Sequence, residues 1–173
     1  MILGLSTANF TLLHVVISLV TIGSGIIAVI GMLGSHRMPG WTALFLGTTV
    51  LTSVTGFVFP IHGFTPALAV GAVSLAILVG ALVALYARHL HGLWRWIYII
   101  TAVAALWFNI FVLIVQSFEK LTLLNPRAPE IGPPFAEPQN TLFMATQGLA
   151  LVAMIVLGAL AVRRFRPGIT MAS

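Results

Sequence analysis

Residues 10–33, FTLLHVVISLVTIGSGIIAVIGML, contain no Asp, Glu, Lys or Arg, and they decide the class of this protein. Only small polar residues and His14 interrupt the apolar run. About 20 consecutive apolar residues are enough for a helix to cross the hydrocarbon core of a bilayer. The stretch is therefore predicted to be a transmembrane helix.

Four further apolar stretches follow at short intervals, so that the predicted spans are residues 10–33, 41–59, 66–86, 94–118 and 141–162. Charged residues make up only 6% of the chain and hydrophobic residues 60%, with a mean hydropathy of +1.11. A soluble domain needs about 25% charged residues to cover its surface. We predict an all-α polytopic integral membrane protein: a single membrane domain over residues 1–173, with five helices in an antiparallel bundle.

Basic residues are shared unevenly between the two sides that five antiparallel spans create. One side holds six of the eight, namely Arg37, Arg88, Arg95, Arg163, Arg164 and Arg166. The other side holds the remaining two and all three acids, namely Lys120, Arg127, Glu119, Glu130 and Glu137. Basic residues concentrate in cytoplasmic loops of membrane proteins. This positive-inside pattern predicts a cytoplasmic C-terminus and an N-terminus outside.

Aromatic residues gather near the arginine-rich side, where an interfacial belt is expected from Trp41, Tyr86, Trp94, Trp96 and Tyr98. The preference for Ala, Val and Arg over Lys is compatible with a bacterial inner-membrane protein. The basic residues form no continuous stripe, so no nucleic-acid partner is expected.

Composition also excludes several kinds of catalysis. The chain has no Cys, which removes thiolate nucleophiles, disulfides and iron–sulfur clusters. It has no Asp, and no Gly-x-Ser-x-Gly motif, so a Ser–His–Asp triad cannot form. We therefore name no catalytic residue, and the interpretation leans away from an enzyme.

Polar side chains inside the predicted spans are the candidates for function. At a rise of about 1.5 Å per residue, four spans place such groups in the outer half of the membrane: His14, Thr52, Thr55, Asn109, Gln116 and Gln147. An ionisable side chain in a span is by default a site hypothesis, and His14 is the strongest candidate. We predict an outward-facing polar pocket that binds an amphipathic molecule, a lipid or quinone-like compound. The proline-rich outer loop, residues 119–139, is either its lid, a docking segment or a stiff exposed spacer.

A purely structural interpretation competes with the pocket. Polar side chains in transmembrane helices often hydrogen-bond across helices, each contributing about 0.6 kcal/mol. His14 can pair in this way with Thr52, Thr55 or Gln147.

Two other functions stay open. Small residues recur every four positions in the third span, at Ala72, Ala76, Gly80 and Ala84. Such a ladder favours close packing within the chain, with a second copy or with a partner membrane subunit, so an accessory or scaffold subunit is the second hypothesis. A histidine-ligated haem or metal protein is the third, with weak ligand candidates in His14, His62 and Glu119.

Overall fold

The computed structural model of the protein describes residues 1–59, 66–121 and 141–166, and within these ranges it contains helices and no β-strand. Five helices are long and apolar enough to cross a membrane. They are α1 (Thr7–Leu33), α2 (Pro39–Val58), α3 (Pro66–Leu82) with its π-helical continuation η1 (Val83–Ala87), α4 (Trp94–Lys120) and α6 (Thr141–Arg164). The predicted all-helical class and the five spans are confirmed, and no predicted boundary is more than three residues away.

The helix ends differ from the predicted span ends for local reasons. The Ser6 hydroxyl accepts a hydrogen bond from the backbone N–H of Asn9 at 3.2 Å, so this N-cap starts α1 three residues before the apolar run. At the other end of the chain, α6 continues through Arg163 and Arg164. The predicted outer loop begins too early at residue 119, because α4 continues to Lys120. The rest of that loop, from residue 122, and His62 lie outside the described residues.

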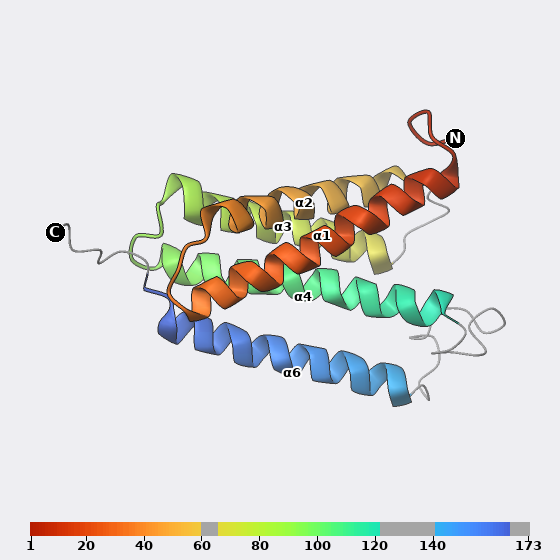
Figure 1. Ribbon diagram of the computed structural model, residues 1–173. Coiled ribbons are helices and arrows are strands. Elements are labelled where there is room, and N and C mark those ends of the chain that lie inside the picture. The colour runs from red at the N-terminus through yellow and green to blue at the C-terminus, as the bar shows by residue number, and fades with distance from the viewer. Residues whose placement is uncertain (60–65, 122–140, 167–173) are drawn as a thin grey trace.

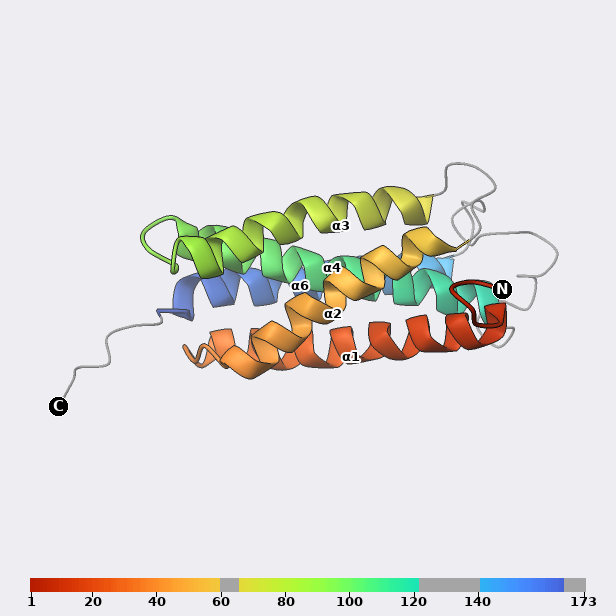
Figure 2. The same cartoon turned by 90° about the horizontal axis from the view of Figure 1, so that it is seen from above.

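Helices that follow each other in the chain also pack against each other, and α1 additionally contacts α4 and α6 (Figures 1 and 2). The early part of α1 lies beside the late part of α2, where His14 meets Thr55. The early part of α4 lies beside both the end of α3 and the segment after α6, through Thr101 and Arg95 respectively. The start of α1 and the end of α6 consequently lie at opposite ends of the helix stack (Figure 1).

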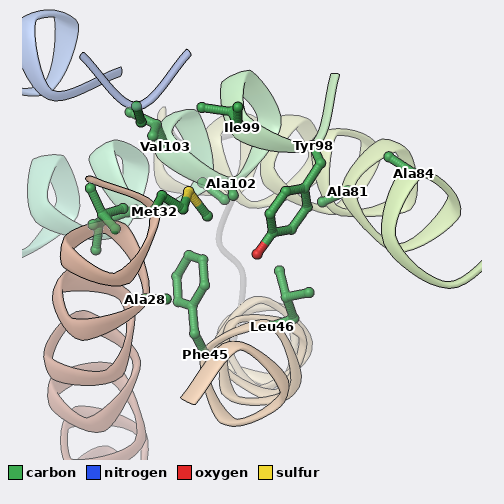
Figure 3. Packing of buried hydrophobic residues seen from close by; sticks show 14 of the residues in the cluster. Ala28, Met32, Phe45, Leu46, Ala81, Ala84, Tyr98, Ile99, Ala102 and Val103 are labelled. Carbon is green, nitrogen blue, oxygen red and sulfur yellow. The ribbon is translucent and has the colours of Figure 1, made fainter. Parts of the chain in front are cut away.

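The main hydrophobic core joins all five described helices, and Met154 and Ala161 are the buried contributions of α6. Figure 3 shows the Tyr98 ring reaching from α4 towards Phe45 and Leu46 of α2, with Met32 of α1 next to Phe45. Tyr98 is only 2% exposed. Its predicted place in an interfacial belt is therefore wrong, whereas Trp41, Tyr86 and Trp96 are exposed as such a belt requires. Depth along a helix is readable from sequence, but the side of the helix that carries Tyr98 is set by packing.

Small residues allow two close helix approaches. A Cβ atom on Gly25 would lie 2.8 Å from Leu106 Cδ1 and from two ring atoms of Phe45, so α1, α2 and α4 meet where only glycine fits. In the third span the ladder is divided. Gly80 and Ala84 pack inside the chain, with Gly80 facing Thr101, while Ala72 and Ala76 stay exposed.

Candidate functional site

The side chains of His14 on α1 and Thr55 on α2 meet between the two helices. The distance between His14 Nδ1 and Thr55 Oγ1 is 2.7 Å. The Thr55 hydroxyl donates its proton to the Leu51 carbonyl, also at 2.7 Å, one turn earlier in α2. Because that single proton is already used, the Thr55 oxygen is the acceptor and His14 Nδ1 is the donor.

This pairing leaves the second imidazole nitrogen of His14 available. Within the described ranges, no hydrogen-bond partner reaches His14 Nε2, and the side chain is half-buried. A neutral imidazole that is protonated on Nδ1 carries a lone pair on Nε2, which accepts a hydrogen bond or binds a metal. His14 thus presents one oriented acceptor.

Aromatic rings and a glycine surround this imidazole. The Phe59 ring packs edge-on against His14, with centroids 5.4 Å apart, and against Phe10 at 5.0 Å. Gly56 lies beside the Cε1 edge, where an added Cβ would come within 3.8 Å. Among the described residues, the imidazole of His14 therefore has an aromatic ring and a glycine as neighbours in addition to Thr55.

A second hydroxyl pair lies deeper between α1 and α2. Thr21 Oγ1 and Thr52 Oγ1 are 3.3 Å apart, and Thr21 donates to the Ile17 carbonyl at 2.9 Å. Thr52 is therefore the donor in the pair. Of the six predicted site residues, His14, Thr52 and Thr55 are brought together here, and Thr21 joins them. Thr21 was not predicted, because nothing in the sequence distinguishes it from the other hydroxyl residues in the spans.

The other three predicted residues lie on α4 and α6. The Asn109 amide donates to the Ala105 carbonyl of its own helix at 2.8 Å, and Gln116 donates to Glu119 Oε2 at 3.1 Å. Gln147 crosses between helices, since its amide donates to the Phe111 carbonyl at 3.2 Å. Among the described residues, no side-chain hydrogen bond connects this set with His14. The predicted residues therefore lie in two groups, one between α1 and α2 and one on α4 and α6.

Both groups nevertheless lie near one end of the helix stack. The start of α1, which carries His14, and the end of α4, which carries Gln116, lie at the same end of the stack (Figure 1). A shallow cavity of about 260 Å³, open to the surroundings, lies between α4 and α6 at this end, and its lining consists of Leu113, Ile114, Ser117, Phe118, Leu142 and Thr146. None of the six predicted residues lines this cavity. It arises from the relative placement of two helices, which no sequence pattern specifies.

Two buried polar atoms in the α4 and α6 region have no hydrogen-bond partner among the described residues: Trp107 Nε1 and Gln147 Oε1. Buried polar atoms are nearly always paired. These two leave one donor and one acceptor unused, so the hydrogen bonding here is less complete than around Thr55. Trp107 was not predicted as a polar site residue, because a tryptophan inside a span is normally counted as apolar.

Metal ligation finds little support in the described part of the chain. No three His, Cys, Asp or Glu side chains there lie close enough to hold an ion. Glu119 is engaged by Gln116, and His62 lies outside the described residues. Among the described histidines, His14 has the arrangement of a metal-bound imidazole, with its other nitrogen donating a proton.

Comparison with known proteins identifies no relative: no protein-family model, no curated protein and no solved structure matches the chain. Function therefore has to be inferred from the side chains themselves.

Proposed function

We propose that the five helices cross a bacterial inner membrane as an antiparallel bundle, with the N-terminus outside and the C-terminus in the cytoplasm. The length and apolarity of the helices support this, as does the segregation of the arginines. Two contacts add weight. Arg95 binds the Phe165 carbonyl and the Arg166 N–H binds Ser35, so the arginine-bearing segments meet at one end of the stack.

The lack of cysteine makes this orientation directly measurable. Leu3 and His91 are both exposed and lie near opposite ends of the stack. In intact spheroplasts, an impermeant maleimide should label a Leu3→Cys protein at once and a His91→Cys protein only after permeabilisation. The reverse labelling order would show that the bundle is inverted.

We propose that the protein binds a small amphipathic molecule, a lipid or quinone-like compound, without transforming it, and that His14 is its polar contact. One observation carries this proposal: His14 Nδ1 is committed to Thr55 while Nε2 has no partner in the described chain. A histidine whose only role was to join α1 and α2 would need neither a defined free nitrogen nor aromatic surroundings. The half-buried Phe59 ring beside the imidazole supplies a flat apolar wall for a ring or an acyl chain, and the buried Phe10 ring packs against Phe59 from inside the bundle.

The geometry narrows the chemistry of the ligand. Because Nε2 of the neutral imidazole is an acceptor, it favours a group that donates a proton, such as a lipid hydroxyl, a phenol or a quinol. A quinone offers only carbonyl acceptors and gains no hydrogen bond from that tautomer. Within the quinone-like class, the reduced, hydroxyl-bearing form is therefore the better fit.

Two matched probes test this preference. An alkylphenol and its methyl ether are titrated calorimetrically into protein in lipid nanodiscs, with empty nanodiscs subtracted. One net hydrogen bond corresponds to about 0.5–1.5 kcal/mol, so the phenol should bind roughly three- to tenfold more tightly. The discrimination should vanish in His14→Ala and persist in Thr11→Val, whose hydroxyl binds only its own helix at the Thr7 carbonyl. Equal binding of both probes, or discrimination that survives in His14→Ala, contradicts the proposal.

A second candidate function rests on the exposed half of the α3 ladder. Ala72 and Ala76 face away from the chain, so another helix can approach closely there. As an accessory subunit, or as a homo-oligomer, the protein should form cross-links from Ala76→Cys and none from Ala81→Cys, because Ala81 is fully buried. Identical cross-linking of both variants would remove this candidate.

A further inference from the structure

The end of the bundle opposite His14 is held together around one buried aromatic residue. Phe165, just after α6, is 1% exposed and packs against Tyr98 with ring centroids 6.1 Å apart. Its carbonyl accepts a hydrogen bond from Arg95 Nη1 at 2.7 Å. The next N–H, that of Arg166, binds Ser35 Oγ at 2.9 Å. The α1–α2 connection, the start of α4 and the segment after α6 are thus tied together.

These contacts gather cations from several segments onto one end. Arg88 lies over the Trp94 ring at 5.0 Å and Arg95 over the Trp96 ring at 5.8 Å. The side chains of five arginines are exposed there, namely Arg37, Arg88, Arg163, Arg164 and Arg166. Glu119, the one carboxylate within the described residues, is in the last turn of α4, at the opposite end. No described acid therefore neutralises the arginine end.

We infer that the arginine end is a binding site for the headgroup of an anionic membrane phospholipid. Guanidinium groups pair well with phosphate oxygens, and basic pockets between transmembrane helices bind anionic headgroups on the cytoplasmic side. Exposed Trp41, Trp96 and Leu93 lie at the same end, as expected where a protein meets the headgroup layer. An acidic protein segment would match the charge but not this aromatic and apolar surface.

The contacts of Phe165 fix the positions of neighbouring arginines. The site therefore has a defined geometry in addition to the general attraction of a basic surface for anions. Arg164 and Arg166 flank Phe165 in sequence, so burial of the ring and the two backbone hydrogen bonds fix where both arginines emerge. Cations held in place before binding lose less conformational freedom when a phosphate arrives. This site lies at the other end of the stack from His14 and does not depend on the ligand proposed there.

The test compares lipid retention by native mass spectrometry, with purified protein exchanged between phosphatidylglycerol and phosphatidylcholine. The wild type should retain phosphatidylglycerol several-fold more strongly. Each basic side chain near an anionic surface changes binding by about fivefold, so Arg164→Gln combined with Arg166→Gln should lower the preference by roughly tenfold or more. Lys120→Gln, which removes one charge at the other end, should leave it within about twofold. If the wild type shows no preference for phosphatidylglycerol, or if Lys120→Gln loses as much of that preference as the double arginine variant, the proposed lipid site is wrong.

A charge-conserving variant separates a built site from diffuse attraction. Ser35→Ala keeps every arginine but removes the acceptor for the Arg166 N–H. The phosphatidylglycerol preference should fall measurably while the melting temperature stays close to that of the wild type. An unchanged preference would mean that net charge alone is responsible, and displacement of the lipid by equimolar acidic peptide would assign the surface to a protein partner. Either result rejects the lipid site.

Discussion

The seam between α1 and α2 differs from the seam between α4 and α6, although all four helices are long and apolar. Side-chain hydrogen bonds cross the first seam at His14–Thr55 and Thr21–Thr52. The second seam has a cavity and a glutamine, Gln147, whose side-chain oxygen has no hydrogen-bond partner among the described residues. In the most apolar 18-residue stretch of each helix, 44% of α1 is buried against 11% of α6. Apolarity alone therefore does not decide how tightly a helix packs.

The contrast fits different proposed roles for the two seams. A binding group is useful only when its orientation is maintained, and second partners such as Thr55 maintain it. The α1–α2 seam can hold His14 in one tautomer because the Thr55 hydroxyl, which donates to the Leu51 carbonyl, accepts from Nδ1. The α4–α6 seam presents most of α6 to the surroundings, which suits contact with lipid or with another helix.

The largest expected effect comes from Gly25→Ala, which inserts a methyl group where α1 meets Phe45 and Leu106 at 2.8 Å. Overpacking of this kind costs roughly 1–3 kcal/mol. The matched control is Gly23→Ala on the same helix, where an added Cβ meets nothing within 4 Å. Unfolding in mild detergent should show a clear loss for Gly25→Ala and none for Gly23→Ala. Similar stability of the two variants would show that the first seam is not tightly packed.

Filling the cavity of the second seam should stabilise the protein, whereas overpacking the first seam destabilises it. Ser117 lines the cavity, and its hydroxyl binds only the Leu113 carbonyl of its own helix. Ser117→Leu should therefore raise the free energy of unfolding by about 1 kcal/mol, as cavity-filling changes commonly do. Thr49→Leu, at a fully buried position of α2, should lower it. A destabilised Ser117→Leu protein would mean that the second seam is as closely packed as the first.

The smallest expected effect tests the hydrogen bond across the first seam. Thr55→Val removes the acceptor for His14 without changing the shape of the side chain much, and should cost about 0.6 kcal/mol. Thr146→Val on α6 loses only a bond to the Leu142 carbonyl of its own helix and should be neutral. Thermal unfolding in the same detergent measures both. A larger loss for Thr146→Val than for Thr55→Val would reverse the proposed roles of the two seams.

The fold was largely predictable because bilayer thickness sets the length of an apolar span. Spans one to five were recognised from apolar runs that contain at most one charged residue, Arg95 in the fourth. The N-cap at Ser6 and the helical turns at Lys120 and Arg164 were missed because they lie outside those runs. The side of each helix that faces the core cannot be predicted from the length of its apolar run. Tyr98 consequently proved to be a core residue.

Only one pairing within the candidate site was predictable. Depth along the spans correctly suggested Thr55 as a partner for His14. Depth could not reveal that Asn109 turns to its own backbone or that Phe59 packs against the imidazole. These features depend on side-chain direction and on neighbours far away in sequence, and so does the cavity between α4 and α6.

The central claim is that His14 holds an amphipathic molecule, and native mass spectrometry of the purified protein in mild detergent tests it most directly. The wild type should carry a bound small molecule that is absent from His14→Ala, weakened in Thr55→Val and retained in Thr11→Val. Because His14 is half-buried and makes a single side-chain hydrogen bond, the variants should remain folded. The same bound species at the same occupancy in wild type and His14→Ala would contradict the claim.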